Sequence, residues 1–69
     1  MNQFVYDQVI ASIPSGSRVL DLGTGDGALL ERLATARGVH GEGVEKDPEM
    51  VARCIERGLI VHQGDILDG

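Results

Sequence analysis

Apolar residues along the chain follow two spacings, which predict helices in some segments and strands in others. Within residues 1–14 they recur at i, i+3, i+4 and i+7, the spacing of an amphipathic helix: Tyr6, Val9, Ile10 and Ile13. Turn residues at 14–17 end this helix, and an aliphatic run at 18–22 predicts a short strand. Helical spacing returns over residues 26–37, whose apolar face is expected to hold Leu29, Leu30, Leu33 and Ala36.

Capping residues divide the second half of the chain. Residues 39–45 alternate weakly and predict a strand, and residues 59–62 predict another. Asp47 followed by Pro48 is typical of a helix start, because the carboxylate accepts from first-turn amides and proline has a helical φ. That helix runs to residue 58 and is expected to bury Cys54 as a small core residue. In the preceding helix, Asp26 is expected to cap the start and Gly38 the end.

The order of these elements predicts an α/β fold. Strands that alternate with helices form parallel sheets through right-handed crossovers. Residues 18–66 therefore resemble one βαβαβ half of a Rossmann-like, doubly wound fold, with strand order 3-2-1. We expect residues 1–69 to be a partial domain, in which the edge of strand 18–22 is bare. Such an edge favours self-association, for example as a two-fold dimer.

Composition excludes several classes of function. Six basic and eleven acidic residues give a net charge of −5, which argues against nucleic acid as a partner. The longest apolar runs are far too short for a membrane span or a signal peptide, so a cytoplasmic location is expected. The single cysteine excludes an intramolecular disulfide, and no His/Cys cluster has the spacing of a zinc site. Aromatic residues make up only 3%, so the core is expected to be aliphatic.

The chemistry concentrates in residues 19–27, which read VLDLGTGDG. Glycines at a strand-to-helix turn allow a sharp bend and the close approach of a ligand, although the same turn also occurs without a ligand. The spacing of Gly23, Gly25 and Ala28 fits a loose dinucleotide fingerprint as well. Asp21 and Asp26 would repel a pyrophosphate, and no Lys or Arg lies between residues 19 and 30.

Three carboxylates follow the three predicted strands. Asp21, Glu45 and Asp65 are expected at the carboxyl ends of adjacent strands, where open α/β sheets bind ligands. S-adenosylmethionine (SAM), a cationic adenosine derivative, suits this set. Asp21 would hold the ammonium, glycine-loop amides would approach the methionine moiety, Glu45 would bind the ribose, and Asp65 would accept from the adenine amino group.

These residues also carry a family resemblance. Residues 19–27 are similar to motif I of class I SAM-dependent methyltransferases. Residues 18–30, 43–48 (GVEKDP), 54–58 (CIERG) and 63–65 (QGD) most resemble the N-terminal third of the MetW family of methionine biosynthesis proteins. The resemblance implies a SAM-binding Rossmann-like domain that works alongside a homoserine O-acyltransferase. It places the cofactor contacts at Asp21, Gly23, Gly25, Glu45, Asp65 and Ile66.

Two positions depart from the family pattern. Thr24 stands where cysteine is frequent, and Lys46 stands where an apolar residue usually packs on adenine, although its aliphatic stem offers some cover. The first hypothesis is the SAM-binding portion of a methyltransferase-like enzyme, with no catalytic residue within this chain and no turnover by the chain alone. The alternatives are a scaffold module for the acyltransferase and an NAD(P)-binding fragment.

Overall fold

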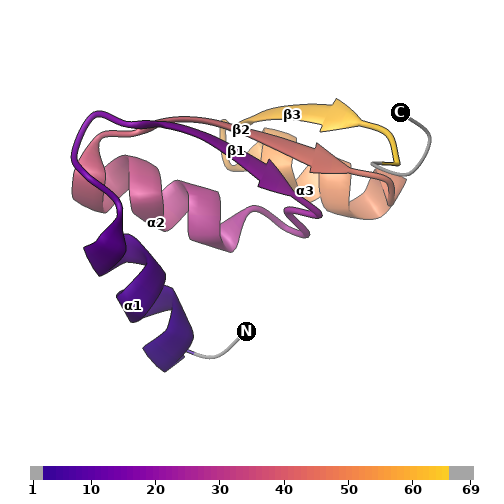
Figure 1. Cartoon of the computed structure of the whole chain (residues 1–69). Helices are drawn as coiled ribbons and strands as arrows, with labels where there is room; N and C mark the ends of the chain where they lie inside the picture. Colours follow the sequence, from indigo (N-terminus) through magenta and orange to yellow (C-terminus); the bar gives the residue numbers. More distant parts are fainter. Residues whose placement is uncertain (1–2, 66–69) are drawn as a thin grey trace.

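The computed structural model describes residues 3–65, which form six elements joined by short turns (Figure 1). Three are helices: α1 (Gln3–Ser12), α2 (Ala28–Arg37) and α3 (Pro48–Glu56). Three are strands: β1 (Arg18–Leu22), β2 (His40–Glu45) and β3 (Ile60–Gln63). Every predicted element is present, and most boundaries differ from the expected ones by one or two residues.

The ends of the helices show which capping predictions hold. Asp47 caps α3, since its Oδ1 accepts from the amide of Glu49 at 2.9 Å. Gly38 ends α2 in the left-handed conformation, as expected. The start of α2 was predicted wrongly, because the cap position is Gly27, which is also left-handed, rather than Asp26. The Asp26 side chain still accepts from the amide of Ala28 at 3.1 Å, so it closes the turn that precedes the helix.

The three strands form one parallel sheet in the order β1-β2-β3, which is the predicted order read from the other side. Arg18 pairs with His40 at one end of β1, and Leu22 pairs with Val44 at the other. Within residues 3–65, β1 and β3 each pair on one side only, so both are edge strands. All three strands point the same way, which brings their carboxyl ends to one edge of the sheet (Figure 1).

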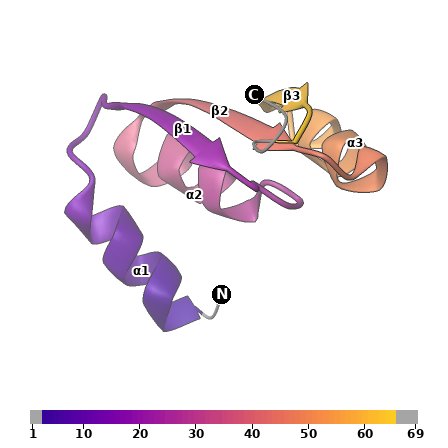
Figure 2. The ribbon, with the colours of Figure 1, turned by 45° about the vertical axis from the view of Figure 1, so that its right-hand side comes forward.

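Both α2 and α3 cover the same face of the sheet, and α1 packs beside α2 (Figures 1 and 2). Two right-handed crossovers in the same direction place their helices on one side, which explains this arrangement. The core lies between that face and the helices, and its most buried side chains are Leu30, Leu33 and Cys54. Ile10 and Val39 join it from α1 and from the turn before β2. Ala36, predicted on the inner face of α2, is exposed.

The opposite face of the sheet has no helix over it within the described residues (Figure 1). Strand alternation points Leu20, Leu22 and Ile60 to this open face, and their exposed fractions are 63%, 55% and 60%. Among residues 3–65, no helix has the length and apolar character that a membrane crossing requires.

Candidate cofactor site at the glycine loop

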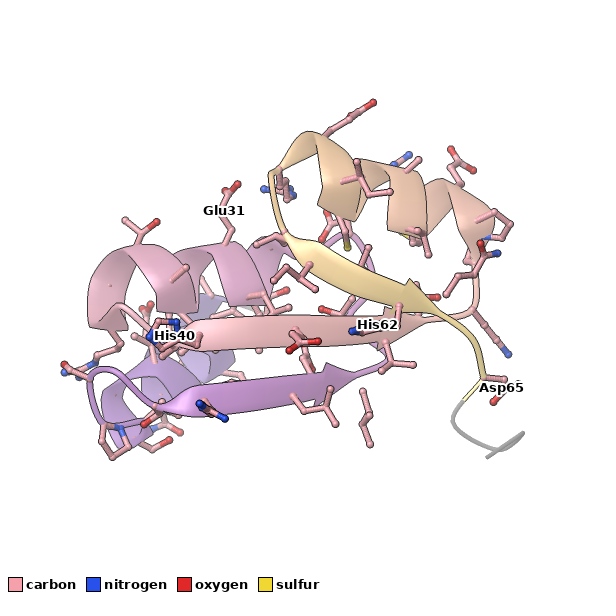
Figure 3. All side chains as sticks on the ribbon, turned by 90° about the horizontal axis from the view of Figure 1, so that it is seen from above. Glu31, His40, His62 and Asp65 are labelled. Atoms are coloured by element: carbon pink, nitrogen blue, oxygen red, sulfur yellow. The ribbon has the colours of Figure 1, made fainter. Side chains whose placement is uncertain are left out.

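The candidate site lies at the carboxyl edge of the sheet, where the glycine loop (residues 23–27) connects β1 to α2. The sequence placed Asp21, Glu45 and Asp65 at this edge, and the structure brings the three strand ends together there. Asp65 follows β3 directly at the edge (Figure 3). The edge is therefore built from three segments that are separated by about twenty residues each along the chain.

The three glycines of the loop serve two purposes. Gly23, Gly25 and Gly27 all have positive φ, of 70°, 61° and 84°, which strains any residue with a Cβ. A Cβ built on Gly23 or Gly25 meets nothing within 4 Å, so a ligand has room to approach the backbone there. A Cβ on Gly27 would collide with Leu59 and would lie 3.0 Å from the Cys54 sulfur. Gly27 is thus a packing glycine, whereas Gly23 and Gly25 form an open cradle.

The first three amides of the loop have partners at the end of β2. Gly23 and Thr24 both donate to the carbonyl oxygen of Val44, at 2.8 and 3.1 Å. Gly25 donates to Oε1 of Glu45 at 2.9 Å. These three amides fasten the loop to the end of β2.

Asp21 and Thr24 form a fixed pair beneath the loop. The Thr24 hydroxyl donates to Oδ2 of Asp21 at 2.8 Å, and Thr24 is 9% exposed. The Thr24 methyl group packs against β2 at Gly43, where a Cβ would come within 2.6 Å of it. The side chain of Thr24 therefore faces the protein and orients the Asp21 carboxylate.

Glu45 lies at the centre of the edge. Its Oε1 accepts from Gly25, and its Oε2 accepts from the amide of Asp47 at 3.0 Å. These backbone N–H donors, Asp47 first and Gly25 second, lower the pKa of Glu45 below its usual range. The carboxylate is ionised at neutral pH and joins the glycine loop to the start of α3.

Helix α3 reaches the loop from the other side. The Cys54 thiol donates to the carbonyl oxygen of Gly25 at 3.2 Å, and Nε of Arg57 donates to the carbonyl oxygen of Asp26 at 2.9 Å. Cys54 is fully buried, as predicted. Arg57 lies on the exposed surface, and its guanidinium also pairs with the Asp26 and Glu31 carboxylates.

Three further residues were predicted to contact the cofactor: Lys46, Asp65 and Ile66. Lys46 follows β2 and is exposed, and Asp65 is partly buried after β3. The amide of Gly64 donates to the carbonyl oxygen of Glu45 at 3.0 Å, which holds the end of β3 beside the end of β2. Ile66 lies outside the described residues.

This geometry favours a ligand that donates hydrogen bonds or carries positive charge. Carboxylates of Asp21, Asp26 and Glu45 surround the loop. A pyrophosphate needs free amides at the start of a helix. At the start of α2, however, Ala28 donates to the Asp26 carboxylate and Gly27 donates to the carbonyl oxygen of Thr24.

Comparison with known proteins decides the family. A sequence model described as "Methionine biosynthesis protein MetW" matches residues 4–69. The chain belongs to the MetW family. Ribosomal RNA small subunit methyltransferase A from Synechococcus sp. (strain CC9605) is 36% identical to this MetW chain over 77 aligned positions, which cover 99% of this chain and 27% of that protein.

Solved structures confirm the Rossmann-like methyltransferase fold. An RNA methyltransferase from Salinibacter ruber, in complex with S-adenosyl-L-homocysteine (SAH), matches with a TM-score of 0.82 at 29% identity. The match covers 100% of this chain and 52% of the methyltransferase chain. A SAM-bound amino pentose methyltransferase from Micromonospora echinaspora, involved in calicheamicin biosynthesis, matches with a TM-score of 0.67 at 42% identity. The match covers 90% of this chain and 27% of that methyltransferase. The MetW chain thus spans 27% to 52% of the length of these proteins.

Proposed function

We propose that this chain binds SAM across the carboxyl ends of β1, β2 and β3, as the cofactor-binding part of a methyltransferase-like protein. The observation that carries the proposal is the edge itself, where the Asp21 and Glu45 carboxylates flank an open glycine cradle that β2 holds in place. SAM carries a sulfonium and an ammonium ion, so an edge rich in acceptors suits it. Membership of the MetW family, and neighbours solved with SAM or SAH, support the same ligand.

The methionine end of SAM would lie over the glycine loop. Asp21, which Thr24 holds in place, would accept from the ammonium group. Gly23 and Gly25 leave the space that the methionine chain needs. When bound, SAM supplies a methyl group on a positively charged sulfur, and alignment of that methyl group with an acceptor provides most of the catalysis in such a reaction. We assign no catalytic residue within this chain.

The adenosine end would lie toward β2 and β3. Glu45 is ionised, and its remaining lone pairs would accept from the ribose hydroxyls. The exposed Lys46 would lay its aliphatic stem against the adenine ring, and Asp65 would accept from the adenine amino group. Ile66, beyond the described residues, completes the proposed adenine contacts.

Calorimetric titration separates this function from the NAD(P) alternative. SAH and SAM, each titrated into the chain, are expected to bind saturably at one site. NAD⁺ and NADP⁺ are expected to show no saturable heat at the same concentrations, because their pyrophosphate would meet the Asp26 carboxylate at the start of α2. Binding of NAD⁺ with no binding of SAH would overturn the proposal.

We also propose that the chain associates with a second copy of itself, and the open face of the sheet supports this. Leu20 and Leu22 are exposed on β1, whose outer edge pairs with no strand among residues 3–65. The occupant we propose is a second copy of the chain, paired through β1. Sedimentation equilibrium would show a dimer whose dissociation constant rises in L20K, and a strict monomer at every concentration would contradict this.

The place of the protein in metabolism is proposed from the family name alone. "Methionine biosynthesis protein" supports a function in that pathway. The cytoplasmic location and the homoserine O-acyltransferase partner are proposed on the sequence resemblance only. Co-purification of the acyltransferase with the tagged wild-type chain, but not with an open-face variant such as L20K, would support the scaffold role. Recovery of equal amounts with both would argue against the open face as the contact.

A further inference from the structure

We propose that Cys54 and Arg57 of the α3 end are positioning residues for cofactor binding, because they clamp the carbonyl oxygens of the glycine loop. This inference rests on the proposed SAM site. The glycines of the loop contribute backbone only, so ligand affinity there depends on how that backbone is oriented. The clamp comes from a helix that begins more than twenty residues later in the chain.

Two successive peptide groups of the loop are held from α3. The Cys54 thiol donates to the Gly25 carbonyl at 3.2 Å, and Nε of Arg57 donates to the Asp26 carbonyl at 2.9 Å. The backbone of Arg57 is itself fixed, because its amide donates to the carbonyl oxygens of Arg53 and Cys54 at 3.1 Å. A rigid helix end thus holds both carbonyls.

The clamp determines where the loop amides point. In a trans peptide the C=O and N–H groups point in opposite directions. The Gly25 carbonyl points at Cys54, so the N–H group of the same peptide, which belongs to Asp26, is directed away from α3. The geometry therefore suits this N–H as a donor for the carboxylate of the methionine moiety, which is the anionic group of SAM.

The chemistry of the two side chains suits this role. Burial raises the pKa of the Cys54 thiol, and the nearby Asp26 and Glu45 charges raise it further, so the thiol keeps the proton that it donates. The guanidinium of Arg57 contacts Glu31 at 3.0 Å and Asp26 at 3.4 Å, and so offsets two negative charges beside the loop. An arginine is required, because lysine lacks the fork that reaches a carbonyl and two carboxylates together.

Four variants separate positioning from packing. C54A stays apolar but removes the donor, whereas C54S keeps a donor but places a hydroxyl in an apolar site. R57K keeps the charge and removes the Nε bond. R53K is the matched control, since Arg53 lies on the same helix and its guanidinium pairs with Glu49 on the exposed surface. For each variant, the SAH dissociation constant and the urea midpoint are measured.

We expect the SAH affinity of each variant to depend on whether it keeps the hydrogen-bond donor to the loop, and not on its stability in urea. C54A and R57K should each weaken SAH binding by about 3- to 10-fold, the effect of one hydrogen bond. C54S should bind SAH more tightly than C54A, even if it unfolds at lower urea, and R53K should match the wild type. If the SAH dissociation constant instead correlates with the urea midpoint across the four variants, the proposed positioning role of Cys54 and Arg57 is wrong. A wild-type chain that binds no SAH overturns the proposed function as well, so the two failures are distinguishable.

Discussion

The same three strands build two regions of opposite character. At the carboxyl edge, the glycine loop is fastened to β2 through Val44 and Glu45 and to α3 through Cys54 and Arg57. On the open face, large apolar side chains are exposed to solvent, and Glu42 of β2 contacts His62 of β3 at 2.6 Å on the exposed surface.

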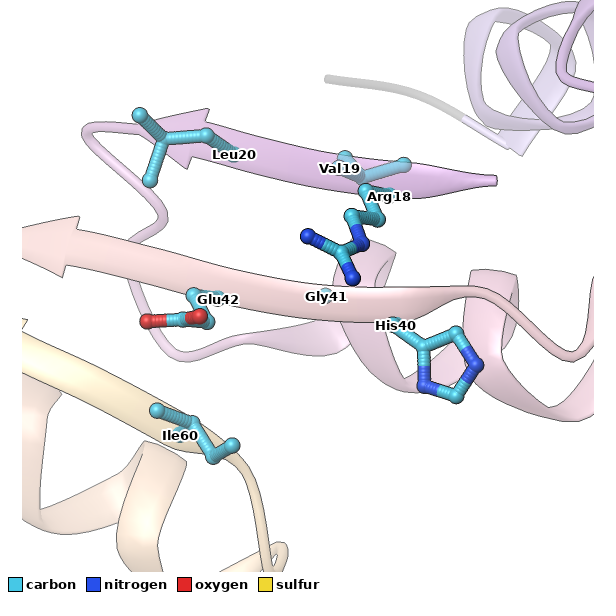
Figure 4. Close-up of a pocket in the computed structure, with 7 residues that line it drawn as sticks. All are labelled: Arg18, Val19, Leu20, His40, Gly41, Glu42 and Ile60. Carbon is cyan, nitrogen blue, oxygen red and sulfur yellow. The ribbon is translucent and has the colours of Figure 1, made fainter. Parts of the chain in front are cut away.

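The open face also contains a hollow of about 700 Å³. Its lining is drawn in Figure 4 and comes from all three strands: Arg18, Val19, Leu20, His40, Gly41, Glu42 and Ile60. A hollow of this volume is large enough to hold a small ligand. The carboxyl edge is the better candidate, because its polar groups are fixed by partners on two sides and converge on one loop. The proposed binding would thus depend on preorganisation more than on the size of a cavity.

The largest expected effect comes from the packing glycine. G27A adds a Cβ that collides with Leu59 at a positive φ, so it should lower the free energy of unfolding by about 3 kcal/mol or more. G25A, the matched variant, has space for its Cβ and only the backbone strain of about 1–2 kcal/mol. Urea denaturation measures both. Equal losses of stability would show that the two glycines do not differ as the structure indicates.

Glu45 should give a loss of stability that depends on pH. The pKa of Glu45 is lowered in the folded chain, so its contribution is present above the usual glutamate value of 4.5 and is lost as the pH falls through the folded value. E45Q places an amide among backbone donors and should cost about 1–3 kcal/mol at pH 7. The difference in the free energy of unfolding between wild type and E45Q should shrink below pH 4.5. A difference that is constant from pH 7 to pH 3 would contradict this assignment.

A smaller effect is expected beneath the loop. T24V keeps the shape of the side chain but removes the hydroxyl that donates to Asp21, and should cost about 1 kcal/mol. T35V on α2 is the control, because the Thr35 hydroxyl donates only to the carbonyl oxygen of Glu31 on an exposed surface. T24V should also weaken SAH binding, whereas T35V should leave the dissociation constant unchanged. An unchanged SAH affinity in T24V would show that Asp21 needs no orientation.

The smallest effect on folding should come from the open face. L20T replaces a side chain that is 63% exposed, so the free energy of unfolding should change by about 0.5 kcal/mol or less. L30A removes a side chain that is 1% exposed on the covered side and should cost about 2–5 kcal/mol. Thermal denaturation of the pair checks the contrast. The chain is kept dilute enough to be monomeric, because the proposed dimer through β1 would cover Leu20. A large loss of stability in L20T under that condition would contradict the contrast.

Local rules predicted most of the fold. The Asp47–Pro48 start and the Gly38 end are set by residues within one turn of each helix, and both are confirmed. The side of α3 that Cys54 occupies follows from helical spacing, which is local as well. The start of α2 was missed, because a left-handed glycine replaced the side-chain cap that the sequence offered at Asp26.

The contacts that organise the site join residues far apart in the sequence, so local rules could not predict them. Arg57 bonds Asp26 across 31 positions, and Cys54 bonds Gly25 across 29. The direction of the Thr24 side chain depends on the space that Gly43 leaves on the neighbouring strand. Sequence reasoning located the edge and its carboxylates, but the partners of the loop amides required the arrangement of β2 and α3 in space.

Amide chemical shifts of the ¹⁵N-labelled chain, followed during a titration with SAH, test the location of the site most directly. The largest changes are expected at Gly23, Gly25, Asp26 and Lys46, at the carboxyl edge. The amides of Arg18, Leu20 and Ile60, around the hollow of the open face, should move little. Large shifts around the hollow with a silent glycine loop would contradict a cofactor site at the loop.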